Sequence, residues 1–130
     1  MSLEAEILEK IQALETRVSE IEIQEHMHRL INLGENVELT ISSGAVTRTQ
    51  TYHSIDTEGD AATDDLDTVN GGTAGDILIL RSVDSARDVV VRDMAGNLQL
   101  AGDFTLGQGA DRIVLIYDGI LWYELSRSNN

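Results

Sequence analysis

The residues of this chain most able to do chemistry are the carboxylates gathered within residues 56–67. No basic residue separates them: Asp56, Glu58, Asp60, Asp64, Asp65 and Asp67. Ca²⁺ takes about six to eight oxygen ligands at set spacings, and this segment lacks the EF-hand loop pattern and does not interleave its carboxylates with enough glycine. We therefore expect a solvated acidic loop, keep a Ca²⁺ or Mg²⁺ site as the alternative, and assign no metal ligand.

Other patterns for catalysis are weak. Gly71, Gly72 and Gly75 are not followed by the Lys-Ser/Thr pair of a phosphate-binding loop. Glycosidases need two carboxylates at a set separation in a cleft, and among so many aspartates no pair is singled out. No Ser-His-Asp spacing or His-rich zinc pattern is present. We therefore expect no enzymatic activity, no catalytic residue and no cofactor.

Composition narrows the possible partners. Without cysteine, neither disulfides nor thiol chemistry stabilise the chain. A net charge of −14 makes nucleic acid a poor partner and favours solubility. No apolar run approaches the roughly 20 residues that span a bilayer, and the acidic N-terminal stretch does not resemble a signal peptide. We expect no membrane partner and synthesis in a cytoplasm.

Residues 3–33 are the element around which the chain is organised. Ile7, Leu14 and Ile21 fall at heptad position d, and Ile11 and Val18 fall at position a. Successive apolar a and d positions predict a helix that packs against copies of itself in a coiled coil. The alternative is a single amphipathic helix folded onto its own domain.

Charges beside this seam favour a parallel arrangement. Lys10 and Arg17 occupy position g, and Glu15 and Glu22 occupy position e. In a parallel bundle a g residue meets the following e residue of its neighbour, which joins opposite charges at both levels. An antiparallel pairing would place like charges together.

A short motif within the helix favours three strands. Residues 17–22, RVSEIE, match the trimerisation motif of short parallel coiled coils, and residues 10–15, KIQALE, match it with Lys in place of Arg. In that motif the arginine stem packs along the a residue and its guanidinium reaches the glutamate of the next chain. We predict a homotrimer whose interface contains Ile7, Lys10, Ile11, Leu14, Glu15, Arg17, Val18, Ile21 and Glu22.

A second apolar stripe follows, offset from the first, where the heptad register loosens. It comprises Ile23, Met27, Leu30 and Ile31. We predict that the coil splays here and that these side chains form a surface for contact with another protein. His28 falls near the axis, where an anion or metal site is the alternative to a partly hydrated histidine. Gly34 ends the helix, so residues 1–33 form the trimerisation and attachment helix and residues 34–130 a β-rich globular domain.

The second domain shows strand patterns throughout. Val37, Leu39 and Ile41 alternate with polar residues, as in a half-buried strand. Residues 77–80 and 89–91 are apolar on both faces and should be central or buried between layers. The class predicted is mainly β, as an antiparallel β-sandwich or jelly-roll-like domain after the helical coiled coil.

The final strands carry the clearest local signal. Asp118 and Gly119 lie between two apolar runs and predict a β-hairpin with a type I′ turn. Trp122 on the return strand should lie in the core with its N–H hydrogen-bonded. A stacking platform for a sugar is the alternative for this side chain.

A series of short motifs runs through the second half of the chain: segments 52–58 (YHSIDTE), 64–68 (DDLDT), 71–72 (GG), 75–78 (GDIL), 87–91 (RDVVV), 96–104 (GNLQLAGDF), 116–119 (IYDG), Trp122 and 124–129 (ELSRSN). Through these motifs, residues 52–129 resemble a module of tailed-bacteriophage virion structural and tail-fibre proteins. It implies a virion location and trimeric assembly, and it carries no catalytic residue across.

Two functions follow from the resemblance and the helix together. The first is a short trimeric fibre whose C-terminal knob attaches to a glycan or protein of the host surface, where three copies of each loop add avidity. The alternative is a capsid decoration, cement or head-fibre protein at a threefold position on the shell. In both, the partners are the chain itself and other virion proteins, and the second apolar stripe (Ile23, Met27, Leu30 and Ile31) is the possible contact with a shell or baseplate.

Overall fold

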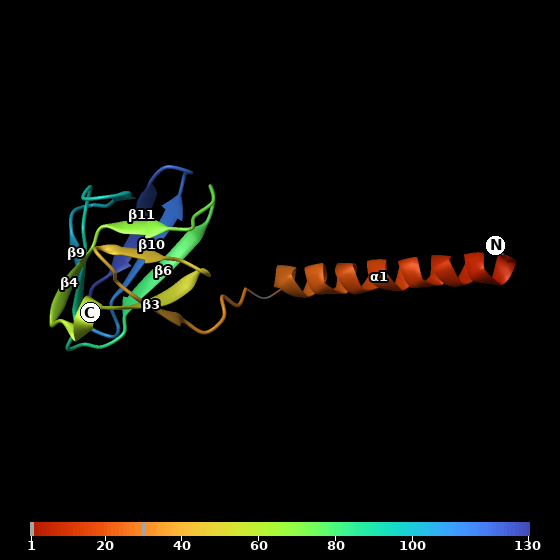
Figure 1. The fold of residues 1–130 in the computed structure, drawn as a ribbon, viewed down its shortest axis with the longest axis horizontal. Coiled ribbons are helices and arrows are strands. Elements are labelled where there is room, and N and C mark those ends of the chain that lie inside the picture. The colour runs from red at the N-terminus through yellow and green to blue at the C-terminus, as the bar shows by residue number, and fades with distance from the viewer. Residues whose placement is uncertain (1, 30) are drawn as a thin grey trace. The chain divides into compact units, whose positions relative to one another are not determined.

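The computed structural model describes residues 2–29 and 31–130, and for residues 20–29 it describes the backbone alone. The chain divides into two compact units, Met1–Asn32 and Leu33–Asn130. The first contains helix α1 (Leu3–Arg29), an uninterrupted helix of 27 residues (Figure 1). Within the described part of the chain, no helix combines the length and the apolar character that crossing a membrane requires.

The start of helix α1 is fixed by its first residues. The Ser2 hydroxyl accepts the N–H of Ala5 at 3.2 Å, which satisfies one of the free amide groups of the first turn. Glu4 and Glu6 then place negative charge at the positive end of the helix dipole. The chain has no proline, and its first glycine is Gly34. No helix-breaking residue therefore lies within the helix.

The second unit is mainly β, which confirms the predicted class. Its elements are β1 (Val37–Thr40), β2 (Ala45–Thr47), β3 (Tyr52–Asp56), the short 3₁₀ helix η1 (Glu58–Asp60), β4 (Thr63–Leu66), β5 (Thr68–Asn70), β6 (Ile77–Ser82), β7 (Asp88–Val91), β8 (Leu98–Gln99), β9 (Phe104–Leu106), β10 (Arg112–Tyr117) and β11 (Trp122–Ser128).

The strands stack in a β-solenoid-like arrangement. β1, β3 and β6 pair in parallel, and so do β2 with β5 and β4 with β7. Successive turns of the chain therefore place β3 and then β6 beside β1 on one face, β5 beside β2 on a second, and β7 beside β4 on a third. The prediction of an antiparallel sandwich or jelly roll is wrong for these strands. The glycine-rich segments between them turn a corner onto the next face instead of reversing the chain.

The corners show the same stacking. The Gly44 carbonyl accepts the N–H groups of Asp67 and Thr68 at 2.8 and 3.1 Å, which joins one corner to the next. An added Cβ at Gly96, in the third corner, would overlap the Asp67 carbonyl and the Thr68 hydroxyl. Glycine is therefore required at position 96 because two backbone segments approach closely there.

The end of the chain reverses this pattern. β9 and β10 run antiparallel to β7 and β6, and β11 folds back along β10, which gives a six-stranded sheet in the order β1-β3-β6-β10-β11-β8. β3, β6 and β10 are seen side by side in Figure 1. Antiparallel strands thus complete the stack at its C-terminal side.

The predicted hairpin at Asp118 and Gly119 is confirmed, but its turn type is not. Among residues 118–121, Gly119 alone has a positive φ, and a type I′ turn needs two. The Asp118 carboxylate accepts the N–H groups of Ile120 and Leu121, both at 2.8 Å. These hydrogen bonds, from Leu121 and then Ile120, lower the pKa of Asp118. They also hold the turn in its observed conformation.

Inward-facing side chains from all three faces form one core. The strand pattern predicted for residues 77–80 holds in part: β6 is central, with Leu78 and Leu80 fully buried and Ile77 and Ile79 half-buried on the outer face. Trp122 is fully buried, and its Nε1–H donates to the Val69 carbonyl at 3.2 Å. The core position of Trp122 is therefore confirmed, and a sugar-stacking role for this ring is excluded by its burial.

His53 joins the first two turns of the stack from a fully buried position on β3. Its Nε2 accepts the N–H groups of Thr49 and Gln50, both at 3.1 Å, and its Nδ1 lies 2.8 Å from the Val37 carbonyl of β1. These partners require the neutral ring with its proton on Nδ1. One side chain thus bonds three backbone groups, two in the segment before β3 and one in β1.

Replacing His53 with Phe should lower the free energy of unfolding by about 1–3 kcal/mol, because the ring volume is kept while two part-buried N–H groups lose their acceptor. Thermal and urea unfolding of the purified protein would measure this. Gln99→Ala, at an exposed strand position, is the control and should change stability by less than about 0.5 kcal/mol. Equal stability of the two variants would contradict the role given to His53.

Candidate functional site

The predicted seam of helix α1 is exposed in the single chain. Ile7, Ile11, Leu14 and Val18 are 49%, 47%, 61% and 45% exposed. Lys10, Ala13, Leu14 and Arg17 line a shallow groove on the helix surface. An isolated helix in water gains nothing from an apolar stripe, so this face is available for a partner.

The charged seam residues are also free of partners within the described part of the chain. Lys10, Glu15 and Arg17 are exposed, and no ion pair joins them to another described side chain. The side chains of Ile21 and Glu22 lie outside the described residues. The intermolecular pairings of Lys10 with Glu15 and Arg17 with Glu22 therefore stay a prediction.

Of the second apolar stripe, only Ile31 can be placed. It is 88% exposed. The side chains of Ile23 and Met27, like Leu30 and the axial candidate His28, lie outside the described residues. The proposed shell or baseplate contact stays a prediction as well.

The acidic segment 56–67 is more structured than a solvated loop. Asp56 is buried and accepts two hydrogen bonds from Nη1 of Arg87, at 3.0 and 3.1 Å. Asp64 accepts the N–H of Glu58 at 2.8 Å, and the Glu58 carboxylate accepts the N–H of Ser43 at 2.8 Å. The expectation of a solvated loop is thus wrong for Asp56, whose counter-charge comes from a distant part of the sequence.

No metal cluster emerges from this segment. Among the described residues, no group of three or more His, Cys, Asp or Glu side chains is placed to hold an ion. The carboxylates of Asp56, Asp64 and Glu58 are instead directed at backbone N–H groups or arginine. These bonds attach the corner after β3 to its neighbours.

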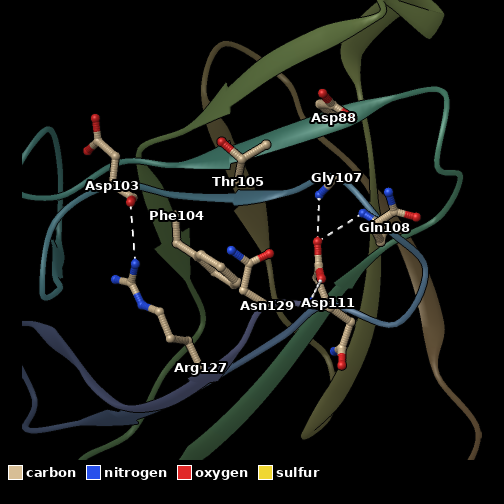
Figure 2. Close-up of a pocket in the computed structure, with 10 residues that line it drawn as sticks. Asp88, Asp103, Phe104, Thr105, Gly107, Gln108, Asp111, Arg127 and Asn129 are labelled. Carbon is tan, nitrogen blue, oxygen red and sulfur yellow. Dashed lines mark hydrogen bonds between the residues drawn. The ribbon is translucent and has the colours of Figure 1, made fainter.

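A hollow lies over β9 and the loop after it. It is an open cleft of about 530 Å³ (Figure 2). Asp88, Thr105, Gln108 and Asn129 contribute polar groups around its rim, and the ring of Phe104 lies at its base. Sequence reasoning did not single out this cleft, because its residues come from segments far apart in the chain.

Asp111, the buried carboxylate beside this cleft, accepts hydrogen bonds from three backbone N–H groups. One oxygen accepts the N–H groups of Gly107 and Gln108 at 3.1 and 2.9 Å, and the other accepts the N–H of Asn130 at 2.7 Å. Figure 2 shows the two bonds to the loop. A carboxylate held by three amide groups fixes the loop after β9 and the end of the chain, and three of its roughly four lone-pair positions are already used.

Arg127 forms the opposite side of the cleft. Its guanidinium lies 4.7 Å from the centre of the Phe104 ring and donates to Glu124 through Nε at 2.9 Å and through Nη2 at 2.5 Å. It also donates to the carbonyls of Gly102 and Asp103. Arg127 therefore covers the aromatic ring and ties β11 to the segment before β9.

Comparison with protein-family models, with curated proteins and with solved structures finds no match to this chain. The resemblance of residues 52–129 to phage virion modules therefore stays an expectation from sequence motifs. The functional argument rests on the geometry of the two units.

Hydrogen bonds from Arg127 lower the pKa of Glu124, against a smaller opposing effect of burial. A carboxyl whose pKa is lower in the folded state stabilises the fold above its unfolded pKa of about 4.3, and this contribution is lost as the pH falls through the folded pKa. Glu124→Gln should therefore lower the free energy of unfolding by about 1–2 kcal/mol at pH 7.

Melting temperatures from pH 7 down to about pH 3 would check this dependence. The difference between the native chain and Glu124→Gln should stay constant down to about pH 5 and then narrow. Ser126→Ala, at an exposed position of the same strand, is the control. A difference that persists unchanged at pH 3 would contradict the charge pairing.

Proposed function

We propose that this protein is a non-enzymatic, homotrimeric structural protein of a bacteriophage virion, in which a parallel three-stranded coiled coil presents three β-solenoid-like units. The observation that carries the proposal is the exposed apolar seam of helix α1. Four successive a and d side chains are about half exposed or more in the single chain. Burial against two further copies removes this apolar surface from water.

Three features of the seam support a parallel trimer. Lys10 and Arg17 precede Glu15 and Glu22 by the interval that joins opposite charges between parallel neighbours. Residues 10–15 and 17–22 repeat the trimerisation motif one heptad apart. The aliphatic stems of Lys10 and Arg17 border the groove beside Leu14, where a neighbour's side chain can insert.

The virion location is supported by the resemblance of residues 52–129 and by the architecture together. Parallel strands stacked turn on turn make a rigid unit whose long-range contacts lie between neighbouring turns. Placed at the end of a coiled coil, such a unit serves as the knob of a short fibre that attaches to the host surface. Three copies of one weak contact then bind with avidity.

Capsid decoration is the second candidate, and Ile31 is the observation that favours it. This side chain is 88% exposed next to the end of the helix, and Leu33 beside it is 38% exposed. Three copies around a trimer axis would present an apolar ring that suits a threefold position on a shell. In this function the coil is the anchor, and the second unit, Leu33–Asn130 (the β unit), faces outward.

The absence of catalysis in this proposal is supported by the state of the carboxylates around the cleft. Asp111 is held by three backbone N–H groups. The Asp103 carboxylate accepts the N–H of Asp93 at 2.7 Å and lies 3.4 Å from Arg92. Two of the three carboxylates that line the cleft are therefore engaged by neighbouring groups, and the third is Asp88.

The double substitution Ile11→Asp with Val18→Asp should abolish the trimer. It would place three carboxylates on each of two axial layers, where burial of unpaired charge opposes assembly. Sedimentation velocity of the full chain would measure the change, with a monomer as the expected result. The β unit should keep its melting transition, because its core contains no residue of the helix.

The matched control is Gln12→Asp with Ser19→Asp, which adds the same charge at the same spacing on heptad position b, outside the seam. This control should sediment as the native trimer. If the seam variant also stayed trimeric, the β unit would have to drive assembly, and the role given to the helix would be wrong.

A further inference from the structure

Two arginines of the β unit stand apart from the others. Arg48, Arg87, Arg92 and Arg127 each lie within 4 Å of a carboxylate oxygen. Arg81 and Arg112 form no ion pair with any described residue, although the chain carries 23 acidic residues against 9 basic ones. Unpaired cations in so acidic a protein are the feature that needs explanation.

The two arginines are neighbours across the sheet. Leu80 of β6 pairs with Ile113 of β10, so the next antiparallel step sets Arg81 opposite Arg112. Leu80 and Ile113 are fully buried, and alternation therefore turns both arginines to the outer face. Both also approach Gly109: Arg112 donates to its carbonyl, and Nη2 of Arg81 lies 3.9 Å from the position of an added Cβ there.

Hydroxyl groups border the pair. Arg81 pairs in register with Ser54 of β3, and Arg112 pairs with Ser128 of β11, which is exposed. Tyr52 lies on the same outer face of β3, two residues from Ser54. Burial raises the pKa of the Tyr52 hydroxyl, but the charge of Arg112 and hydrogen bonds from the two guanidinium groups and Asn36 lower it below its ordinary value.

Both guanidinium groups keep donors that the main chain does not use. Nε of Arg81 donates to the Ser82 carbonyl, which leaves both of its Nη groups without a main-chain acceptor. Nη1 of Arg112 donates to the carbonyls of Gly109 and Asp111, which leaves Nε and Nη2. Like charges opposite one another destabilise a sheet, and a bound anion would remove that repulsion.

We propose that Arg81 and Arg112, with the Tyr52 hydroxyl beside them, form a binding site for an oxyanion group. The planar guanidinium fork matches the oxygens of phosphate, sulfate or carboxylate. The anion would lie across β6 and β10 on the outer face, next to Gly109. Binding of the anion requires neither trimerisation nor a virion location.

If the protein is an attachment fibre, the oxyanion would belong to a polysaccharide of the host surface. Phosphate, sulfate and uronate groups are the acidic groups of surface polysaccharides, so this site would give the knob a receptor chemistry that its few exposed aromatics do not. That extension rests on the proposed function, whereas the binding of the oxyanion itself does not.

The test is the melting temperature of the full chain at rising millimolar concentrations of sodium phosphate. The pH is held constant, and sodium chloride keeps the ionic strength constant. Parallel series with sodium sulfate and sodium glucuronate distinguish the phosphate, sulfate and carboxylate groups. A ligand that binds only the folded state raises the melting temperature in a saturable way. We expect a rise of a few degrees for at least one of the three anions.

Variants locate the effect. Arg81→Gln and Arg112→Gln should each lose the anion-dependent rise, whereas Arg92→Gln, which removes the same charge from a position 42% exposed, should keep it. Equal responses of all these proteins, or no response of the native chain to any of the anions, would overturn the proposal. If a variant fails to fold, calorimetric titration of the native chain with phosphate, sulfate and glucuronate still tests the proposal. Absence of binding heat for all three anions would overturn it.

Sedimentation of each protein separates this proposal from the proposed function. A trimer without an anion response would overturn the oxyanion site alone. A monomer with an anion response removed by Arg81→Gln would overturn the assembly and leave the site intact.

Discussion

Burial of one apolar seam is the constraint on which this account depends. Ile7, Ile11, Leu14 and Val18 lie on one face of helix α1 and remain about half exposed or more in the single chain. Fully burying side chains of this size is worth about 1.5–3 kcal/mol each. In helix α1, described by itself, these side chains are exposed, and burial against copies of the helix would supply this energy.

The β unit, by contrast, is stabilised by a core and hydrogen bonds of its own. Its turns stack through parallel strands, and Trp122 and His53 meet backbone groups of neighbouring turns from fully buried positions. Asp111 and Arg127 then hold the C-terminal strands against the loops beside them. The two units thus differ: one is stabilised by its own contacts, and the other leaves an apolar stripe exposed, which is the basis of the proposed trimer.

Local features of this fold were predictable from sequence, and the long-range ones were not. The mainly β class, the hairpin at Asp118 and the burial of Trp122 each rest on neighbouring residues or on composition. Parallel stacking was missed because corners between faces use the same glycine and aspartate residues as hairpin turns. In β-solenoids the strand that pairs with a given strand is one full turn away, and no local pattern marks its register.

The candidate sites divide in the same way. Heptad spacing identifies the seam, because a helix repeats on a scale that the sequence displays directly. Pairing of Asp56 with Arg87, and the apposition of Arg81 and Arg112, depend on which turns lie next to each other. Sequence alone therefore shows the charges of these residues but neither their partners nor their lack of one.

The most direct test of the central claim is the molar mass of the native chain in solution, measured by light scattering over a range of concentrations. Assembly through the helix seam predicts a stable species of three times 14.2 kDa. A monomer of 14.2 kDa at all concentrations would contradict the coiled coil and remove the basis of the proposed function.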